Sequence, residues 1–590
     1  MSFTKTRKIL VGYLAVVGGL VIVGALTYGS VSWMGKKRVP PKTVLEVDFE
    51  RGLVEYVPDD PVARFMLAKP QVLLDVVDAL SRASEDDRVV ALVARVGTAR
   101  MGMAQIQEVR DAVLAFRGKG KPAIAYAETF GEFGPGNTAY YLATAFDEIY
   151  LQPSGDVSLT GLIFRTPFLR GTLDKLGVVP RVDHRREYKS LKNLLTERKY
   201  TKPHREASRR VMESMFGQIV KGISEARNLS EEEVKRIVDR GPLLGKGAVD
   251  AKLVDGLAYR DEVYARVKEK AGGDAGYLSL PDYLDRAGRP DRKGATVALI
   301  YGVGAIRRGE SRYHPAMGRF FMGPDTVAAA FRAAIEDEDV RAILFRVDSP
   351  GGSYVASDTI WRETVRAREA GKPVIVSMGN AAASGGYMVS MAADRIVAQP
   401  ATVTGSIGVF AGKMVTSAFW KKVGVSFDEV HTSENATLWA ATEDYTPAQW
   451  ARLQEILDRI YGDFTAKTER GRNLPREKVL EIAKGRAWTG EDAKSLGLVD
   501  ELGGFSVALR LARKAAGIPE GAPIRVKAFP ERKPLWKRTW ERRPSRAEGT
   551  AAALVDILET VQPLAREAGD LGLGFSPGVL TMPEPEPAPE

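Results

Sequence analysis

The chain has 590 residues, of which 44% are hydrophobic, and its 85 lysines and arginines exceed its 75 aspartates and glutamates to give a net charge of +10. It contains no cysteine, which excludes disulfides, thiol nucleophiles and thiolate metal sites. The length and composition suit a globular protein of several domains, and the basic excess favours either nucleic acid or an anionic membrane surface as a partner.

A long uncharged stretch near the N-terminus decides between these two partners. No charged residue occurs between Ile9 and Gly35, and Trp33 lies near the end of the run. About 20 apolar residues span a bilayer, and an aromatic residue near the end suits the interface. We predict a retained single-pass anchor within residues 1–38, with a cleaved signal peptide as the alternative. Nucleic acid is then not expected as a partner, and basic residues on both sides of the span leave its orientation open.

Beyond this span the chain repeats itself. Several runs occur twice in the same order: V-V-A-L-V-A-R-V-G at residues 89–97 with V-R-A-I-L-F-R-V-D at residues 340–348, and T-G-L-I-F at residues 160–164 with T-G-S-I-G-V-F at residues 404–410. The offset is about 250 residues throughout, as expected of a tandem duplication. We therefore predict two similar domains, at residues 39–290 and 291–530.

The first copy carries a lysine in a setting that suits a catalytic base. Lys189 lies in E-Y-K-S, after the strand-like run from Val178 to Val182. Three nearby leucines are candidates to desolvate its amine and lower its pKa, namely Leu191, Leu194 and Leu195. Ser190 and Ser406 are both candidates to hold the neutral amine by a hydrogen bond.

The histidines offer no better base. They are His184, His204, His314 and His431, and none lies in a glycine-rich context. No pair has the spacing of metal ligands, so neither a metal site nor another cofactor is expected. This scarcity favours a lysine as the base of any nucleophilic site.

The second copy alternates strand and helix patterns. Branched apolar runs at residues 342–347, 373–378 and 396–398 predict buried strands. Residues 359–370 and 387–393 have the patterns of helices. Strands that alternate with helices favour an α/β fold built on a parallel sheet.

Ser384 is the candidate nucleophile of this copy. It lies in A-A-A-S-G-G-Y, after a predicted strand and near the start of a predicted helix. Small neighbours let a substrate backbone approach the hydroxyl, and a helix N-terminus offers free N–H groups to an oxyanion. Gly385 is one candidate donor, and Gly351 or Gly352, in the S-P-G-G turn, is the other. The alternative is a tight packing turn with no catalytic role.

The two copies have lost opposite halves of this chemistry. Asn137 aligns with Ser384, and Ala436 aligns with Lys189. Because a serine hydroxyl needs a base to become a nucleophile, we predict one composite site that takes its serine from the second copy and its lysine from the first. Whether the two meet within one chain or between neighbouring chains stays open. Ser406, in the T-G-S-I-G loop, is a candidate to orient the lysine.

The tail, residues 531–590, falls into two parts. Residues 532–546 carry Trp536 and Trp540 among basic residues, which suits either anionic headgroups or a solvated segment packed on the domain. The closing run M-P-E-P-E-P-A-P-E is of low complexity and is expected to be disordered.

Taken together, these motifs resemble those of a known family. D-S-P-G-G-S, A-A-S-G-G-Y, T-G-S-I-G-V-F and Y-K-S occur together as in the signal peptide peptidase A (SppA) family, in its long, duplicated bacterial type. W-T-G-E-D-A-K-S-L-G-L-V-D at residues 488–500 is also characteristic, and the resemblance covers residues 1 to about 530. It implies an α/β fold of two tandem Clp-protease/crotonase-like domains, built of stacked ββα units, after an N-terminal transmembrane helix.

The resemblance also implies a function. It implies a serine endopeptidase that degrades signal peptide remnants and other small unfolded peptides through an acyl-enzyme, without ATP. By position, Ser384 becomes the nucleophile, Lys189 the general base, Gly352 and Gly385 the oxyanion donors, and Ser406 the hydroxyl near the lysine. It further implies a homotetramer anchored in the bacterial inner membrane, with its catalytic part on the periplasmic side.

Two other readings compete with this one. The crotonase fold also serves acyl-CoA enzymes, but the predicted anchor and the absence of a carboxylate pair at the site argue against that activity. An inactive membrane scaffold is the other alternative, and the intact Ser384 and Lys189 argue against it. One departure from the family pattern is Asn380, where some relatives carry an acidic residue, and it touches none of these roles.

Overall fold

The computed structural model describes residues 38–57, 70–98, 101–291, 293–314, 319–530 and 579–581. The predicted anchor at residues 9–35 and the basic segment at residues 532–546 lie outside these residues. Among the helices that are described, none combines the length and the apolar character needed to cross a bilayer.

The first copy is built on a parallel six-stranded sheet. Its strands run in the order β8-β4-β3-β2-β1-β9. Their bounds are β1 Thr43–Asp48, β2 Val89–Arg95, β3 Ala123–Ala127, β4 Glu148–Leu151, β8 Gly256–Leu257 and β9 Gly276–Ser279. The runs are almost continuously apolar because both faces of a parallel sheet are covered by helices.

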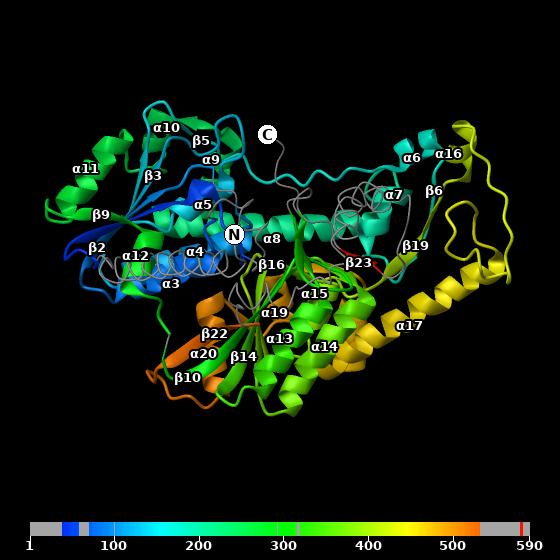
Figure 1. The fold of residues 1–590 in the computed structure, drawn as a ribbon. Helices are drawn as coiled ribbons and strands as arrows, with labels where there is room; N and C mark the ends of the chain where they lie inside the picture. Colours follow the sequence, from blue (N-terminus) through cyan, green and yellow to red (C-terminus); the bar gives the residue numbers. More distant parts are fainter. Residues whose placement is uncertain are drawn as a thin grey trace, which may run out of the picture.

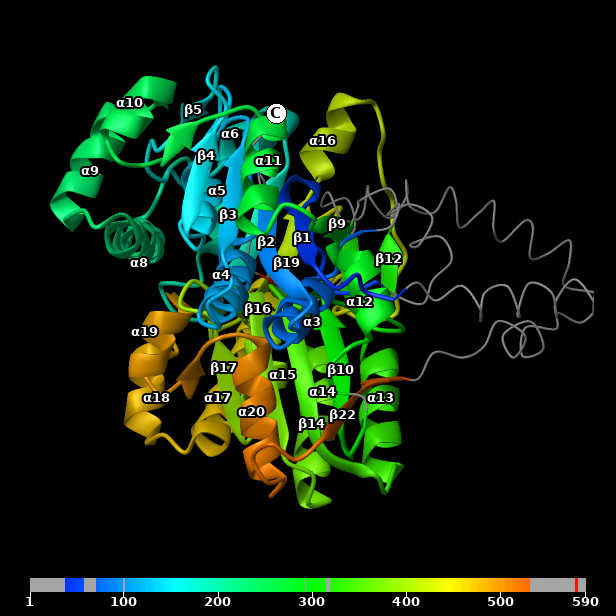
Figure 2. The same ribbon diagram turned by 90° about the vertical axis from the view of Figure 1, so that its left-hand side faces the viewer.

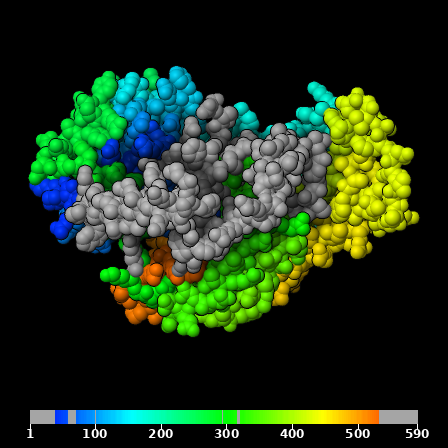
Figure 3. All heavy atoms as spheres, in the orientation of Figure 1, coloured from blue at the N-terminus to red at the C-terminus, as the bar shows by residue number. Residues whose placement is uncertain are grey.

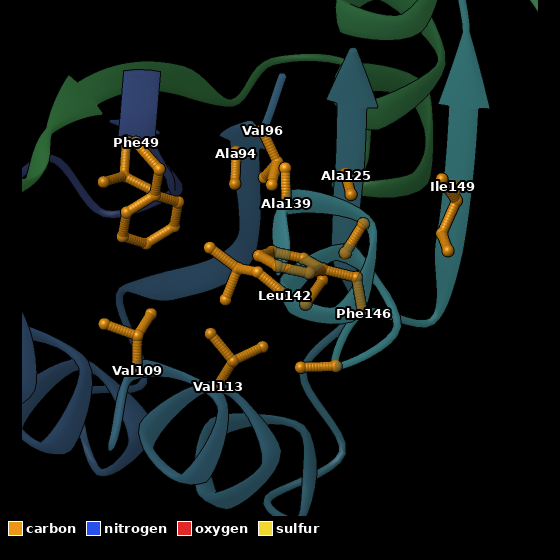
Figure 4. Packing of buried hydrophobic residues seen from close by; sticks show 14 of the residues in the cluster. Phe49, Ala94, Val96, Val109, Val113, Ala125, Ala139, Leu142, Phe146 and Ile149 are labelled. Atoms are coloured by element: carbon orange, nitrogen blue, oxygen red, sulfur yellow. The ribbon is translucent and has the colours of Figure 1, made fainter. Parts of the chain in front are cut away.

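Helices cover the two faces of this sheet unequally. One face packs on α3 (Leu73–Ser84), α4 (Met103–Arg117), α5 (Asn137–Ala143) and α12 (Leu280–Ala287), and the other on α11 (Arg260–Lys270). Figure 4 shows the larger core, in which Ala94, Ala125 and Ile149 of three neighbouring strands face Val109 and Val113 of α4. The sheet is therefore the middle layer of three.

The second copy repeats this sheet strand for strand. The corresponding order is β21-β17-β16-β14-β10-β22, again parallel. The bounds are β10 Ala295–Val303, β14 Val340–Ser349, β16 Val374–Ala383, β17 Arg395–Ala398, β21 Glu501–Leu502 and β22 Ile524–Phe529. One face is covered by α13 (Pro324–Glu336), α14 (Tyr354–Glu369) and α15 (Gly385–Ser390), and the other by α20 (Phe505–Ala515). The α/β class and the duplication predicted from the sequence are thus confirmed.

Two predicted helices of the second copy begin earlier than their patterns indicated. The helix predicted from residue 359 begins at Tyr354, because the Ser353 side chain caps it by accepting from the Ala356 N–H. The helix predicted from residue 387 begins at Gly385, immediately after Ser384. Strand β16 also runs on to Ala383, so strand, serine and helix follow without a break.

Each copy also contains one long helix. Helices α8 (Lys202–Arg227) and α17 (Pro447–Arg472) each begin after a threonine cap and end at a left-handed asparagine, Asn228 and Asn473. Proline in the first turn and asparagine past the last turn are the expected start and stop signals. The two helices are therefore counterparts, and Figure 1 shows α8 crossing between the copies and α17 running along the outside of the second.

The remaining elements are short. In the first copy they are η1 Phe49–Arg51, β5 Asp156–Val157, α6 Arg170–Leu176, β6 Val179–His184, η2 Ser190–Lys192, α7 Asn193–Thr196, α9 Glu231–Arg240, β7 Leu243–Leu244 and α10 Gly245–Asp250. In the second they are β11 Ala305–Ile306, β12 Arg312–His314, β13 Arg319–Met322, β15 Gly351–Ser353, β18 Val403–Gly405, β19 Phe410–Val415, α16 Ser417–Lys422, α18 Arg476–Ile482, β20 Ala487–Thr489 and α19 Gly490–Ser495. A further strand, β23 (Val579–Thr581), pairs antiparallel with β15.

The copies are stacked on each other, the first above the second in both ribbon views (Figures 1 and 2). Helix α4 lies at the contact, and its polar side chains are buried there. Gln107 accepts a hydrogen bond from the Ala401 N–H at 2.8 Å. Glu108 lies 2.9 Å from Arg346 and accepts from the Phe505 N–H at 2.6 Å. A polar helix face that the sequence alone would place in solvent is thus the interface between the copies.

The copies are also joined by a two-stranded ribbon. Strand β6 of the first copy pairs antiparallel with β19 of the second over its whole length, from Val179 opposite Val415 to His184 opposite Phe410. This ribbon lies at one end of the molecule beside α6, α7 and α16, an end formed mainly by the yellow atoms in Figure 3. Because β6 leads directly into the loop that carries Lys189, the ribbon delivers that loop to the second copy.

Candidate active site

Ser384 occupies a strained position between β16 and α15. Its φ and ψ angles are 55° and −116°, a region that residues with a side chain rarely adopt. The side chain is fully buried, and the backbone N–H donates to the Gly405 carbonyl at 2.8 Å. Strain of this kind is held only where the surroundings demand it, and it gathers at functional sites.

The glycines after Ser384 are required by close packing. A Cβ on Gly385 would lie 2.6 Å from Ser357 Oγ, and one on Gly386 would lie 2.4 Å from the Ser349 carbonyl oxygen. Neither distance is compatible with a side chain. The sequence A-A-A-S-G-G therefore folds into a turn that presses the start of α15 against the end of β14.

Lys189 meets Ser384 within the same chain. Its Nζ lies 2.8 Å from Ser384 Oγ, although the two residues are 195 positions apart. The amine also donates to the Ser406 carbonyl at 2.9 Å and lies 3.1 Å from Ser406 Oγ. Of the two serines considered from the sequence, it is therefore Ser406 that accepts hydrogen bonds from the amine.

Burial lowers the pKa of the Lys189 amine to about 7. The side chain is only 1% exposed, and desolvation is the cause of the shift. Its closest polar neighbours are uncharged oxygens, so no carboxylate holds the protonated form. A substantial fraction of the amine is therefore neutral at pH 7, as a general base requires.

The loop that carries Lys189 is fixed to the second copy through its backbone. The Arg185 N–H donates to the Val409 carbonyl at 2.8 Å, and the Tyr188 N–H to the Lys484 carbonyl at 3.1 Å. Gly485 makes the closest approach, since a Cβ there would lie 2.6 Å from the backbone nitrogen of Lys189. Backbone contacts from the second copy thus hold the lysine in place.

Ser406 follows β18 in a left-handed conformation, with φ at 51°. Its N–H donates to the Arg486 carbonyl at 2.9 Å, which ties the loop to the segment before β20. The side chain is 2% exposed. Both oxygens of Ser406 that reach Lys189 are therefore fixed by the backbone of the loop.

The two glycines predicted as oxyanion donors lie against each other beside the serine. A Cβ on Gly385 would be 3.0 Å from the Gly352 nitrogen. Gly352 lies in β15 with φ at 154°, where a Cβ would strike Ile306 at 2.1 Å. The S-P-G-G segment, predicted as a turn, therefore ends in a short strand whose glycine backbone borders the site.

Neither a metal cluster nor a histidine accompanies Ser384 and Lys189 in the described part of the chain. Among the described residues, no cluster of three histidine, aspartate or glutamate side chains is placed to hold a metal ion. His204 is buried against Tyr200, and burial lowers the pKa of its ring to about 4. None of the hydrogen bonds of Ser384 or Lys189 described above involves a histidine.

Sequence reasoning missed the contribution of residues 484–486. The characteristic motif quoted above begins at Trp488, just after this segment. The pair Gly485-Arg486, one residue before that motif, was the available signal, because glycine is favoured where backbone must approach closely. Asn380 was noted as a departure, and its role is now visible: its Oδ1 accepts from the Gln105 N–H at 3.2 Å, in the first turn of α4.

Comparison with known proteins agrees with this geometry. The sequence profile of peptidase family S49 matches the chain twice, at residues 115–273 and 366–519. The chain belongs to peptidase family S49. It is therefore a serine peptidase with two S49 regions, as the resemblance to the duplicated SppA type implied. The acyl-CoA alternative finds no support in this membership.

Two relatives illustrate the similarity. Protease 4 of Salmonella typhi is 34% identical over 460 residues, which cover 76% of this chain and 72% of that protein. The chloroplastic serine protease SPPA of Arabidopsis thaliana is 30% identical over 446 residues, which cover 74% of this chain and 65% of that protein. The chain also shares 13% identity with a ClpP1 variant of known structure from Listeria monocytogenes, in an alignment that covers 36% of this chain and 94% of that one with a TM-score of 0.23.

Proposed function

We propose that this protein is a membrane-anchored endopeptidase in which Ser384 and Lys189 form the catalytic dyad. The observation that carries the proposal is the 2.8 Å contact between Lys189 Nζ and Ser384 Oγ in a fully buried setting. A neutral amine at that distance can take the hydroxyl proton as the oxygen attacks a peptide carbonyl. Family membership supports the peptidase reaction itself.

The reaction would proceed in two steps through an acyl-enzyme. In the first, Ser384 Oγ bonds to the carbonyl carbon, Lys189 receives the proton, and the N–H groups of Gly352 and Gly385 stabilise the oxyanion. The protonated lysine then gives its proton to the departing amine as the peptide bond breaks. In the second step Lys189 takes a proton from a water molecule, whose oxygen bonds to the acyl carbon. The ester bond to Ser384 Oγ then breaks, and the protonated lysine returns the proton to that oxygen. Ser406 keeps the amine aimed at the hydroxyl in both steps.

Substrates are proposed to bind as extended strands beside β15. The pairing of β23 with β15, which sets Leu580 opposite Gly352, supports this mode because it places an extended segment of chain on the glycine strand. A substrate paired in the same way presents its backbone to the proposed oxyanion donor. Main-chain pairing of this kind gives affinity without demanding one side-chain sequence.

The biological substrates are proposed to be signal peptide remnants and other small unfolded peptides. The uncharged stretch at residues 9–35 would anchor the protein in the bacterial inner membrane, with the catalytic part on the periplasmic side and no need for ATP. The resemblance to the SppA family supports these assignments.

A homotetramer is proposed from the way the copies meet. The contact is heterologous, since α4 and α8 of the first copy pack on β14, α19 and α20 of the second. The second copy's counterpart of α4 is α14, and there Val355 and Arg362 are 61% and 53% exposed. A heterologous contact repeated between chains generates a ring when its rotation closes, and an open filament otherwise. Four chains with two copies each would form such a ring.

The test is hydrolysis of a leucine-rich fluorogenic peptide by the full chain in detergent. Ser384→Ala and Lys189→Ala are expected to lose activity while they keep the fold, and Asn137→Ala, at the aligned position of the first copy, is expected to keep activity. A signal peptide embedded in vesicles then tests the substrate class. Full activity of Lys189→Ala at pH 7 would remove the dyad from consideration.

A further inference from the structure

We infer that Arg486 is a positioning residue for the Lys189 base, because its guanidinium is clamped between Tyr188 and Trp488 beside the loop that carries the lysine. This inference rests on the proposed function, and it assigns a role to a residue that makes no contact with the reacting atoms. We call residues 185–189 the base loop.

The side chain of Arg486 has three partners. Its guanidinium carbon lies 5.1 Å from the centre of the Tyr188 ring and 4.6 Å from that of Trp488. Its Nη1 donates to Glu206 of α8 at 2.6 Å, and the Tyr188 hydroxyl donates to the same carboxylate at 3.0 Å. Arg486, Glu206 and Tyr188 therefore contact one another in a closed cycle, and Tyr188 directly precedes Lys189.

The backbone next to Arg486 contacts the same loop and the same base. The Arg486 carbonyl accepts from the Ser406 N–H at 2.9 Å, and the Gly485 N–H donates to the Ile407 carbonyl at 2.9 Å. Lys484 accepts from Tyr188, and Gly485 packs directly on Lys189. One segment thus fixes both the loop that holds the amine and the serine that orients it, and the Arg486 side chain anchors that segment.

Only arginine suits this position. Its planar guanidinium can stack on two rings while it bonds a carboxylate in its plane, whereas a lysine ammonium is a point charge without a face. The side chain is 15% exposed, so it also covers the base loop from solvent. Removing it leaves Tyr188 and Glu206 without their common partner and opens a path for water toward Lys189.

Water at Lys189 would change the pKa of the amine as well as the stability of the protein. The lowered pKa of the amine has burial as its cause, so hydration moves the pKa back toward its ordinary value. The charged and titratable groups on the elements packed around the base loop are Asp183, His184, Arg185, Arg186, Glu187, Tyr188, Lys192, Glu206, Asp458, Tyr461, Lys484 and Arg486. None of them contributes to the shift, so a change in pH profile reports access of water.

The experiment compares the pH dependence of kcat/KM for the full chain, Arg486→Ala, Arg486→Lys and Arg210→Ala. Arg210 is the matched control, because it joins the same helix α8 to the second copy through Asp492 at 2.5 Å and lies apart from the base loop. We expect Arg486→Ala to move the acidic limb upward by at least about one pH unit, which is about a fivefold loss at pH 7, approaching tenfold at lower pH, that recovers near pH 9. Arg486→Lys should restore only part of this, and Arg210→Ala should not move the limb.

A loss of equal size at every pH, or an unchanged profile, overturns the inference. If Arg486→Ala does not fold, Glu206→Gln removes the carboxylate of the same cycle from an exposed position and should move the limb in the same direction by less. Activity of Lys189→Ala would instead end the proposed function, so the two failures are distinguishable.

Discussion

The two copies share one sheet order, yet their corresponding turns after the third strand differ in conformation. In the second copy this turn holds Ser384 at a φ of 55°, with its hydroxyl against Lys189. In the first copy Asn137 begins α5, and the preceding Gly136 has a φ of −100°. Ser384 is therefore strained at this turn, whereas the aligned Asn137 takes a helical conformation.

Asn137 also closes the site of the first copy. Its Oδ1 accepts from the N–H groups of Thr160 and Gly161 at 3.1 and 3.0 Å, and its Nδ2 donates to the Gly161 carbonyl at 2.9 Å. These are the counterparts of Thr404 and Gly405 in the loop that leads to Ser406. The Asn137 amide therefore hydrogen-bonds the backbone of the first copy's loop. In the second copy the corresponding loop leads to Ser406, whose oxygens accept from Lys189. The proposed nucleophile therefore lies in one copy and the proposed base in the other.

The largest expected effect separates Ser384 from its aligned partner. Ser384→Ala should reduce kcat by at least about a thousandfold, because the nucleophile of a dyad cannot be replaced. Asn137→Ala should change kcat by less than about threefold, since that copy has no base. Peptide hydrolysis by both full-length variants measures the contrast. Similar losses in the two variants would mean that both copies are catalytic.

The second prediction concerns the pH dependence of activity. Since the Lys189 amine must be neutral and its pKa is about 7, kcat/KM should rise with pH through that value and level off above it. A pH–rate profile between pH 5 and about 9 measures the limb. A limb near the ordinary lysine value of 10.5 would contradict the effect of burial.

The same lysine should cost stability, and the cost should depend on pH. Its folded pKa lies below the unfolded value of 10.5, so between these values the unfolded chain binds a proton that the folded chain lacks. The contribution of this group to stability therefore rises with pH from about 7 to about 10.5. Lys189→Met should raise the free energy of unfolding at pH 7, by at most about 5 kcal/mol, and by less at pH 10. Urea unfolding at both values checks the difference, and an equal gain at both would refute it.

Another contrast compares two aligned arginines. Arg346 is 3% exposed and holds Glu55 and Glu108 of the first copy, each at 2.9 Å. Its counterpart Arg95 is 29% exposed on its side chain. Arg346→Met should destabilise the protein by about 3–5 kcal/mol, because two carboxylates stay buried without a cation. Arg95→Met should cost about 1 kcal/mol or less.

Chemical denaturation of both variants measures this contrast, with the double change of Arg346→Met and Glu108→Gln as the control. Removing one buried carboxylate along with the arginine should recover part of the loss. Equal costs for Arg346→Met and Arg95→Met would show that the contact between the copies does not depend on the buried ion pairs.

The smallest expected effect lies at Asn380, which caps α4 from the other copy. Asn380→Ala should lower the free energy of unfolding by about 1 kcal/mol, as the loss of a helix cap does. Asn380→Asp keeps the acceptor for the Gln105 N–H and should be close to neutral. If the alanine variant is as stable as the aspartate variant, the contact is not a cap.

Much of this protein could be predicted from local patterns. The apolar runs from Val89 and Val340, the glycines around Ser384 and the offset between the copies are all properties of neighbouring residues or of self-similarity. They determined the α/β class, the duplication, the candidate nucleophile and the resemblance to a peptidase family. Helix starts were less accurate, because a side-chain cap such as that of Ser353 decides the first turn.

Only the tertiary structure decided how the site is assembled. Lys189 and Ser384 are 195 residues apart, and no periodicity states that β6 pairs with β19 of the other copy. The sequence also did not determine that Ser406 rather than Ser190 binds the amine, that Gly485 packs on Lys189, or that the polar face of α4 is buried. These features depend on contacts between distant segments, which form once both sheets have folded and stacked. Burial at that contact, which no local composition encodes, is what lowers the pKa of Lys189 and suits it to the proposed role of base.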